Sequence, residues 1–221
     1  MIKLFEQYNE YSKVREWLDE LKIQDYTIND DLSVDVDGHV HIYKAGVKEI
    51  PIQFNRVMGD FICDNNGLTT LKGCPIYVQV DFDCSNNELS SLEYAPKIVR
   101  GDFSCHNNKL TTLKGCPNQI PDDFYCNDNQ LTTLEYCPKQ IGGVFYCDDN
   151  ELTTLKYFPE YISGEIYIAS NTLPNEILNY NGDIRLLIKY QDEYGLWNND
   201  ESFNSGRFNI LLKDLNNGTL D

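Results

Sequence analysis

The chain has 221 residues, of which 41% are hydrophobic, so it carries more apolar side chains than a disordered chain despite its net charge of -17. The acidic balance repels phosphate, which disfavours direct binding of nucleic acid. Because no run of about 18 apolar residues occurs and the start of the chain is polar, we expect no membrane span, no secretory signal and a cytoplasmic location.

The N-terminal segment 1–27 is expected to form a helical cap. Between residues 4 and 21, apolar side chains recur at the spacing of one helix face. They are Leu4, Tyr8, Tyr11, Val14, Trp17, Leu18 and Leu21. Such a helix would close the first open end of a repeat domain, where an exposed edge strand would invite aggregation.

Residues 28–56 keep the frame of the following repeats only loosely, and we interpret them as a divergent first repeat. Within this segment, His39 and His41 are two residues apart and therefore share one face of a strand. The pair could bind a metal ion, but no third ligand of clear spacing accompanies it. We therefore interpret both as surface histidines and predict neither a metal site nor a cofactor.

The segment 57–177 repeats itself every 21 residues. Each of five repeats has the apolar spacing V-x3-F-x-C-x2-N-x-L-x2-L, and a sixth keeps the frame without the cysteine. The repeated cysteines are Cys63, Cys84, Cys105, Cys126 and Cys147. A fixed period of this length indicates a solenoid of stacked structural units.

The spacing within each repeat predicts a short strand, a bend and an extended return arm. Phe61 and Cys63 are two apart, so their side chains share the buried face of a strand, and stacked strands form a parallel sheet. Asn66 and its equivalents fall at the bend, where their amides can bond unpaired backbone groups. A proline in each return arm, as at Pro75, favours extended structure over helix. We therefore predict a β-rich solenoid with an extended convex side.

The eight cysteines divide into two columns. One column lies inside the strands, and the other precedes the return prolines at Cys74, Cys116 and Cys137. In other repeats isoleucine, alanine or phenylalanine replaces the cysteine, which a metal ligand or a disulfide would not tolerate. We interpret all eight as buried structural residues.

The repeat pattern resembles that of leucine-rich repeats, L-x2-L-x-L-x2-N-x-L, with phenylalanine and cysteine in place of two leucines. The form GDFYCxNNxLTTLxGCPxxV is similar to small leucine-rich repeat proteins that tailed bacteriophages and some bacteria encode. This resemblance implies an intracellular interaction module acting on a host protein, and it supplies no catalytic residue.

The C-terminal segment 178–221 is expected to form a second helical cap. DIRLLIKYQDEYGLW and SGRFNILLKDL are two short amphipathic segments, joined by the polar stretch NNDESFN. These helices would shield the other end of the solenoid.

The outward-facing residues of the sheet differ along the chain. The position before each phenylalanine carries Asp60, Asp81, Asp102 and Asp123, and the position after it carries Asp83, Tyr125, Tyr146 and Tyr167. The aspartates could bond neighbouring backbone or serve solubility alone. However, like charges about 5 Å apart repel, whereas lysine and glutamate alternate at the position after the second leucine. This contrast favours a functional acidic face.

Two hypotheses follow for the function of a repeat protein whose concave face is acidic and rich in tyrosine. In the first, a non-enzymatic module binds a basic host or cellular protein, with Tyr125, Tyr146 and Tyr167 as anchors and Asp60, Asp81, Asp83, Asp102 and Asp123 selecting the partner. In the alternative, the file of carboxylates imitates nucleic acid and inhibits a nuclease or a repressor. The sequence contains no motif that predicts an enzyme.

Overall fold

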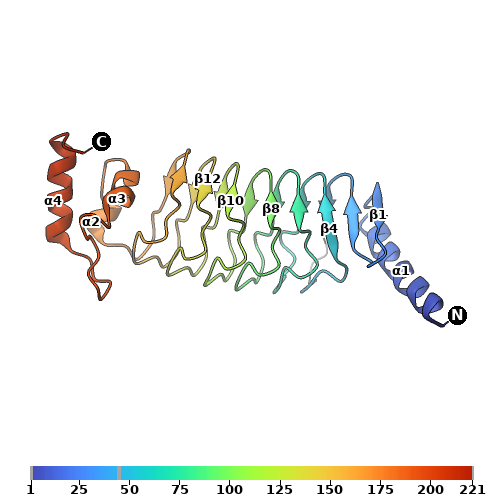
Figure 1. The fold of residues 1–221 in the computed structure, drawn as a ribbon. Helices are drawn as coiled ribbons and strands as arrows, with labels where there is room; N and C mark the ends of the chain where they lie inside the picture. The colour runs from blue at the N-terminus through green and yellow to red at the C-terminus, as the bar shows by residue number, and fades with distance from the viewer. Residues whose placement is uncertain (1, 44–45, 221) are drawn as a thin grey trace.

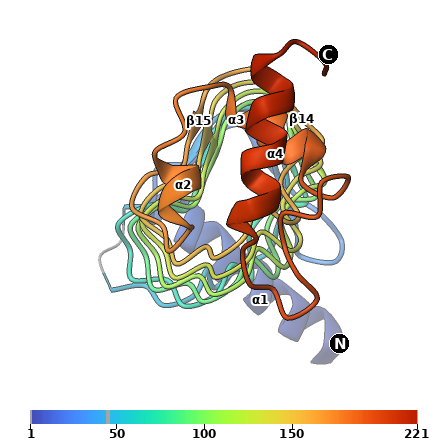
Figure 2. The same ribbon diagram turned by 90° about the vertical axis from the view of Figure 1, so that its left-hand side faces the viewer.

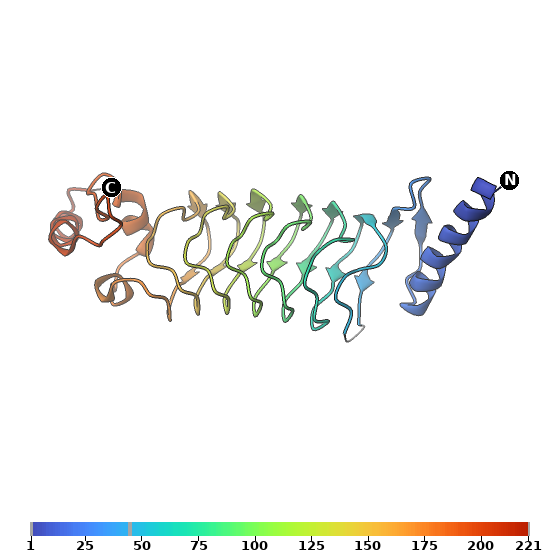
Figure 3. The ribbon, with the colours of Figure 1, turned by 90° about the horizontal axis from the view of Figure 1, so that it is seen from below.

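The computed structural model describes residues 2–43 and 46–220, which form a parallel β-solenoid of about 6 turns with a few helices (Figure 1). Helix α1 (Ile2–Glu20) lies at the N-terminal end. Helices α2 (Asn175–Leu178), α3 (Ile184–Tyr190) and α4 (Ser205–Asn216) lie at the C-terminal end. The turns follow one another along an almost straight axis, as seen from below in Figure 3.

One side of the solenoid is a parallel sheet of seven very short strands, which we call the first sheet. Neighbouring strands pair residues that are one repeat apart, such as Phe61 with Phe82. The strands are β3 (Val40–His41), β5 (Phe61–Ile62), β7 (Phe82–Asp83), β9 (Phe103–Ser104), β11 (Phe124–Tyr125), β13 (Phe145–Tyr146) and β15 (Ile166–Tyr167). The predicted parallel stacking is confirmed.

The return arm carries a second set of strands that the sequence analysis describes only as extended. Five strands form one sheet: β1 (Tyr26–Ile28), β2 (Val34–Val36), β4 (Phe54–Val57), β6 (Tyr77–Val78) and β8 (Ile98–Val99). Three more form another: β10 (Gln119–Ile120), β12 (Gln140–Ile141) and β14 (Tyr161–Ile162). All these pairs are parallel except β1 with β2.

The core runs the length of the solenoid between these strands. The phenylalanine of each repeat is fully buried, and adjacent rings from Phe61 to Phe145 have centroids 5.0 to 6.0 Å apart. Leu68, Leu71 and their equivalents are buried beside them. One repeat alone could not bury this face, so packing between neighbouring turns stabilises the fold.

The asparagine of each repeat connects adjacent turns at the bend. Nδ2 of Asn108 donates to the carbonyls of Cys84 and Cys105, each at 3.1 Å, and Oδ1 accepts the N–H of Leu89 at 3.0 Å. The same pattern recurs at Asn87, Asn129, Asn150 and Asn171. The predicted structural role of these asparagines is confirmed.

All eight cysteines are free thiols, and six of them are buried. Cys116 and Cys137, in the column before the return prolines, are partly exposed. Burial raises the pKa of the Cys105 and Cys147 thiols well above the usual range, so these groups are poor nucleophiles.

The terminal helices contact the core. Leu18 of α1 is fully buried, and Trp17 packs against Phe54 with ring centroids 6.2 Å apart. Figure 2, which looks along the solenoid from its C-terminal end, shows α3 and α4 in front of the turns. Among the described residues, none of the helices combines the length and the apolar character needed to cross a bilayer.

Two details at the C-terminal end differ from the sequence analysis. The first amphipathic segment is helical only to Tyr190, and the C-cap residue Gln191 donates through Nε2 to the Leu155 carbonyl at 3.0 Å. In the last repeat, α2 replaces the extended return arm. Pro174 lies directly before α2, a position that suits its fixed backbone angle and missing N–H.

Candidate functional site

The outer surface of the first sheet brings together the eight residues that the sequence analysis selects. Register places Asp83, Ser104, Tyr125, Tyr146 and Tyr167 in one file across the strands. Asp60, Asp81, Asp102 and Asp123 form a second file, linked by hydrogen bonds one repeat apart. We call this surface, defined by the eight selected residues, the tyrosine face.

The three tyrosines form a continuous stack. The ring of Tyr146 lies 4.7 Å from that of Tyr125 and 4.7 Å from that of Tyr167, with interplanar angles of 9° and 6°. Parallel rings at this distance follow from strand spacing, because identical side chains on adjacent parallel strands lie about 4.8 Å apart. The rings cover one another's faces and leave their edges and hydroxyls toward solvent, with Tyr167 44% exposed at the end of the stack.

Two of the tyrosine hydroxyls are held by carboxylates of the neighbouring file. Tyr125 donates to Oδ2 of Asp123 at 3.0 Å, and Tyr167 donates to Oε2 of Glu165 at 2.8 Å. Burial and the Asp123 carboxylate raise the pKa of Tyr125, and the hydrogen bond to Glu165 raises that of Tyr167. The position beside Tyr146 is Val144, which carries no carboxylate. The hydroxyls of Tyr125 and Tyr167 therefore stay protonated at physiological pH, and the stack is fixed at both ends.

The aspartate file is part of the backbone structure. Oδ1 of Asp60 accepts the N–H of Asp81 at 3.2 Å, and Oδ1 of Asp81 accepts the N–H of Asp102 at 2.8 Å. The series continues from Asp102 to Asp123 at 2.8 Å and from Asp123 to Val144 at 2.7 Å. The series ends at Val144, because its side chain offers no oxygen to the next repeat.

The hydrogen bonds to backbone N–H groups offset the repulsion between the like charges of this row. Burial raises the pKa of the Asp102 carboxyl, and the charges of Asp81 and Asp123 raise it further, whereas the N–H of Asp123 lowers it. The structure thus supports the alternative in which the aspartates bond neighbouring backbone. Their Oδ2 atoms are free of these backbone bonds, and Oδ2 of Asp123 accepts the Tyr125 hydroxyl.

Asp83 belongs to the tyrosine file rather than to the aspartate file. Its Oδ1 accepts the N–H of Ser85 within the same turn at 2.8 Å. Farther along the sheet, Nδ1 of His106 lies 2.8 Å from Oγ of Ser104. Asp83 and the nearby pair of Ser104 and His106 are therefore held by local hydrogen bonds.

A second group of exposed tyrosines was not predicted from the sequence. Tyr94, Tyr136 and Tyr157 are 62%, 54% and 62% exposed, and their φ angles are 71°, 69° and 64°. The equivalent residues in other repeats are Gly73 and Gly115, also with positive φ. Because the backbone is left-handed at this position, a tyrosine there costs about 1 to 2 kcal/mol of backbone strain that a glycine avoids. That alternation of glycine and tyrosine is the signal that could have identified them.

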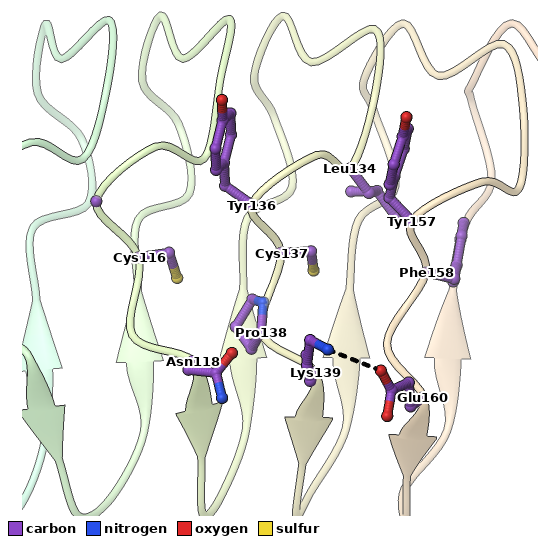
Figure 4. A pocket seen from close by; sticks show the side chains of 11 residues that line it. Cys116, Asn118, Leu134, Tyr136, Cys137, Pro138, Lys139, Tyr157, Phe158 and Glu160 are labelled. Atoms are coloured by element: carbon purple, nitrogen blue, oxygen red, sulfur yellow. Dashed lines mark ion pairs between the residues drawn. The ribbon is translucent and has the colours of Figure 1, made fainter.

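Tyr136 and Tyr157 line a surface groove of about 470 Å³ (Figure 4). Its polar side is an ion pair of 3.1 Å between Lys139 and Glu160. Cys137 lies at its base, next to Pro138. The groove adjoins the return strands β12 and β14, so it is a surface separate from the tyrosine face.

One cluster at the N-terminal end of the first sheet has the composition of a metal site. His39, His41 and Asp60 each offer a ligand atom, and these atoms all lie within 4.8 Å of one another. The third group of this cluster, which the sequence spacing did not reveal, is Asp60, one repeat after His39.

The fold and the outer surface define the chain as a β-solenoid with a stacked aromatic face. Comparisons with models of known protein families and with curated proteins find no match.

Proposed function

We propose that the chain is a non-enzymatic interaction protein whose tyrosine face binds a protein partner with a basic surface. The observation that carries this proposal is the stack of Tyr125, Tyr146 and Tyr167, whose rings are parallel at 4.7 Å and lie at least partly exposed on the outer side of the sheet. Tyrosine offers a large contact area at low entropic cost, and it is enriched where proteins meet.

The neighbouring carboxylates favour a partner that presents arginine or lysine. A guanidinium can lie against a tyrosine ring while it bonds a carboxylate such as Oδ2 of Asp123, 3.0 Å from the Tyr125 hydroxyl. The net charge of -17 adds long-range attraction toward a basic partner, which raises the association rate and makes it sensitive to salt.

The acidic mimic of nucleic acid is the weaker alternative. Carboxylates on adjacent strands recur about every 4.8 Å along the solenoid. One strand of DNA instead carries one charge per about 3.4 Å of helix axis. One oxygen of each aspartate in the file is also held by a backbone N–H. Both points favour a protein-binding role for this face.

We further propose that the solenoid is of the leucine-rich repeat type of the phage and bacterial proteins that its sequence resembles. The bonding of the repeated asparagines at the bend supports this assignment. The terminal helices would then act as caps. The eight free thiols fit a reducing compartment, so we place the protein in the cytoplasm, which for a phage protein is that of the host.

The test begins with the full-length protein as bait in a lysate of the native or host cell. Partners are identified by mass spectrometry and then purified for affinity measurements. We expect the double variant Tyr125→Ala, Tyr146→Ala to lose about 2 kcal/mol of binding free energy, or about 30-fold in affinity, because buried tyrosines are frequent hot spots.

The control is the double variant Tyr94→Ala, Tyr136→Ala, which removes the same number of rings from another surface. It should bind with unchanged affinity. Equal binding by the Tyr125 and Tyr146 variant would exclude the proposal, provided circular dichroism shows a native fold. Competition between the bait and DNA for the partner would indicate the nucleic-acid mimic instead.

A further inference from the structure

The cluster of His39, His41 and Asp60 is built on paired strands. His41 belongs to β3, which pairs with β5, and His41 lies opposite Ile62. The N–H of Val40 donates to the Asp60 carbonyl at 2.8 Å, so the backbone holds β3 against the residue that carries the carboxylate. The ligand atoms of the cluster lie within 4.8 Å of one another. Backbone pairing, rather than a flexible loop, therefore brings the three groups together.

Nδ1 of His39 lies close to two polar groups of Asp60. Its Nδ1 accepts the backbone N–H of Asp60 at 3.1 Å, which requires a lone pair on that nitrogen. The same Nδ1 lies 2.9 Å from Oδ2 of Asp60, which is also an acceptor when ionised. In one tautomer Nδ1–H donates to Oδ2, and in the other Nδ1 presents a lone pair, which is the form that binds a metal ion.

His41 has one nitrogen engaged and one without a partner. Its Nδ1 lies 2.8 Å from the hydroxyl of Tyr43, a bond that can orient the ring. Its Nε2 is buried from solvent and has no hydrogen-bond partner in the part of the chain that the structure describes. A histidine that binds a metal commonly has this arrangement, with one nitrogen bonded to a second group and the other free for the ion.

Asp60 is oriented by the aspartate file. Its Oδ1 accepts the N–H of Asp81 at 3.2 Å, which directs Oδ2 toward His39. The side chain of His39 is 61% exposed and that of Asp60 is 22% exposed, so an ion can reach the cluster from solvent. Asp60 therefore differs from Asp81 and Asp102, which have no histidine in the preceding repeat.

We propose that His39, His41 and Asp60 bind a divalent transition-metal ion, with Zn²⁺ the best match to their chemistry. Two imidazoles and one carboxylate are a ligand set that zinc accepts, with bonds of about 2.0 to 2.2 Å and water in the fourth position. The ion would give Nε2 of His41 a partner. This site is independent of the tyrosine stack and does not require the proposed function.

The test is titration of the full-length protein with Zn²⁺ by calorimetry at neutral pH, with a non-thiol reductant present. We expect one ion to bind per chain. Replacement by Co²⁺ should give the visible absorption of a tetrahedral site without a thiolate band, which separates this cluster from the cysteines. The variant His39→Ala, His41→Ala should lose this binding, and Tyr43→Phe should weaken it by about 10-fold to 100-fold, because the hydroxyl that orients the His41 ring is lost.

The matched control is His106→Ala, which removes the remaining histidine from the same sheet and should bind Zn²⁺ as the unmodified protein does. Circular dichroism of each variant checks the fold. Absence of Zn²⁺ binding at millimolar concentration would overturn the proposal. Unchanged binding in the variant His39→Ala, His41→Ala would overturn it as well, because the ion would lie elsewhere.

Discussion

Oδ1 of Asp102 accepts the backbone N–H of Asp123, one repeat later, at 2.8 Å. A donor that lies outside the strand ladder is thereby satisfied by a side chain, and the bond recurs along the file. Gly101 fits the same arrangement, because a Cβ at that position would overlap Oδ1 of Asp81. The aspartates thus have a structural role as acceptors that is separate from their charge.

The two roles of Asp102 can be separated by substitution. Asp102→Asn keeps an oxygen acceptor for the N–H of Asp123 and removes the repulsion from Asp81 and Asp123. Asp102→Ala leaves that N–H without its acceptor. We expect Asp102→Ala to lower the free energy of unfolding by about 1 to 2 kcal/mol at neutral pH and Asp102→Asn to leave it unchanged or raise it. Urea unfolding measures both, and equal destabilisation by the two variants would contradict the assignment.

The pH dependence of Asp102 has a definite sign. Its pKa is raised above the usual 3.8 in the folded protein, so the folded state binds the proton more tightly than the unfolded state. The resulting stability is present below pH 3.8 and is lost as the pH rises through the raised pKa. The advantage of Asp102→Asn over the unmodified protein should therefore grow with pH across this window, as unfolding curves at several pH values would show.

Asn108 should be among the least replaceable polar residues of the solenoid. Asn108→Ala removes donors from the carbonyls of Cys84 and Cys105 and the acceptor of the Leu89 N–H. We expect a loss of about 2 to 5 kcal/mol in the free energy of unfolding, because buried groups are left unsatisfied.

Two further variants test the cause of that loss. Asn108→Asp has nearly the same size but lacks the donor, so it should also destabilise, although it leaves no cavity. Asn118→Ala removes an exposed asparagine of the return arm and should change stability by no more than about 0.5 kcal/mol. A mild effect of Asn108→Asp would show that packing, rather than hydrogen bonding, fixes the bend.

Gly115 and Gly67 separate steric overlap from backbone strain. Both have positive φ, of 104° and 80°, but only at Gly115 would a Cβ overlap the carbonyl oxygen of Leu92. Gly67→Ala should cost about 1 kcal/mol from strain, and Gly115→Ala should cost at least about 1 kcal/mol more from the overlap. Thermal and urea unfolding of the two variants provide the comparison. Equal costs would show that the neighbouring turn moves aside.

The stacking direction and the buried columns could be predicted because a fixed period of 21 residues is typical of stacked repeats and not of an ordinary globular core. Phe61 and Cys63 are buried as their spacing indicates, and Ile62 between them faces outward. The second ladder of strands in the return arm was harder to predict, since Tyr77–Val78 and its equivalents have only two residues each. Runs of that length carry no strand periodicity.

The chemistry of the site could be predicted only in part. The file of Tyr125, Tyr146 and Tyr167 follows from register, but the direction of each aspartate carboxylate depends on side-chain torsions that a sequence does not specify. The approach of Asp60 to His39 was available in principle, because the two residues are one repeat apart. This proximity was not predicted, because residues 28–56 keep the repeat spacing only loosely. The place of His39 within the repeat could therefore not be assigned.

Tyr94, Tyr136 and Tyr157 have a left-handed backbone at a position that glycine occupies in other repeats. A glycine at Gly73 and Gly115 suggests positive φ, but Tyr94 at the same place in the repeat between them suggests ordinary backbone. The repeat geometry prevails over the local preference, because neighbouring turns fix the path of the chain. Positions where repeats alternate between glycine and a large residue are therefore informative in solenoids.

Site-specific photo-crosslinking of the captured partner tests whether the tyrosine face is the surface that binds it. A photoreactive phenylalanine analogue replaces Tyr146 in one variant and Tyr136 in another, so that two faces of the same molecule are compared. We predict crosslinks from position 146 and none from position 136, with crosslinking at position 146 reduced at high salt. Crosslinks confined to position 136 would contradict this role of the tyrosine face and assign partner binding to the groove beside the return strands.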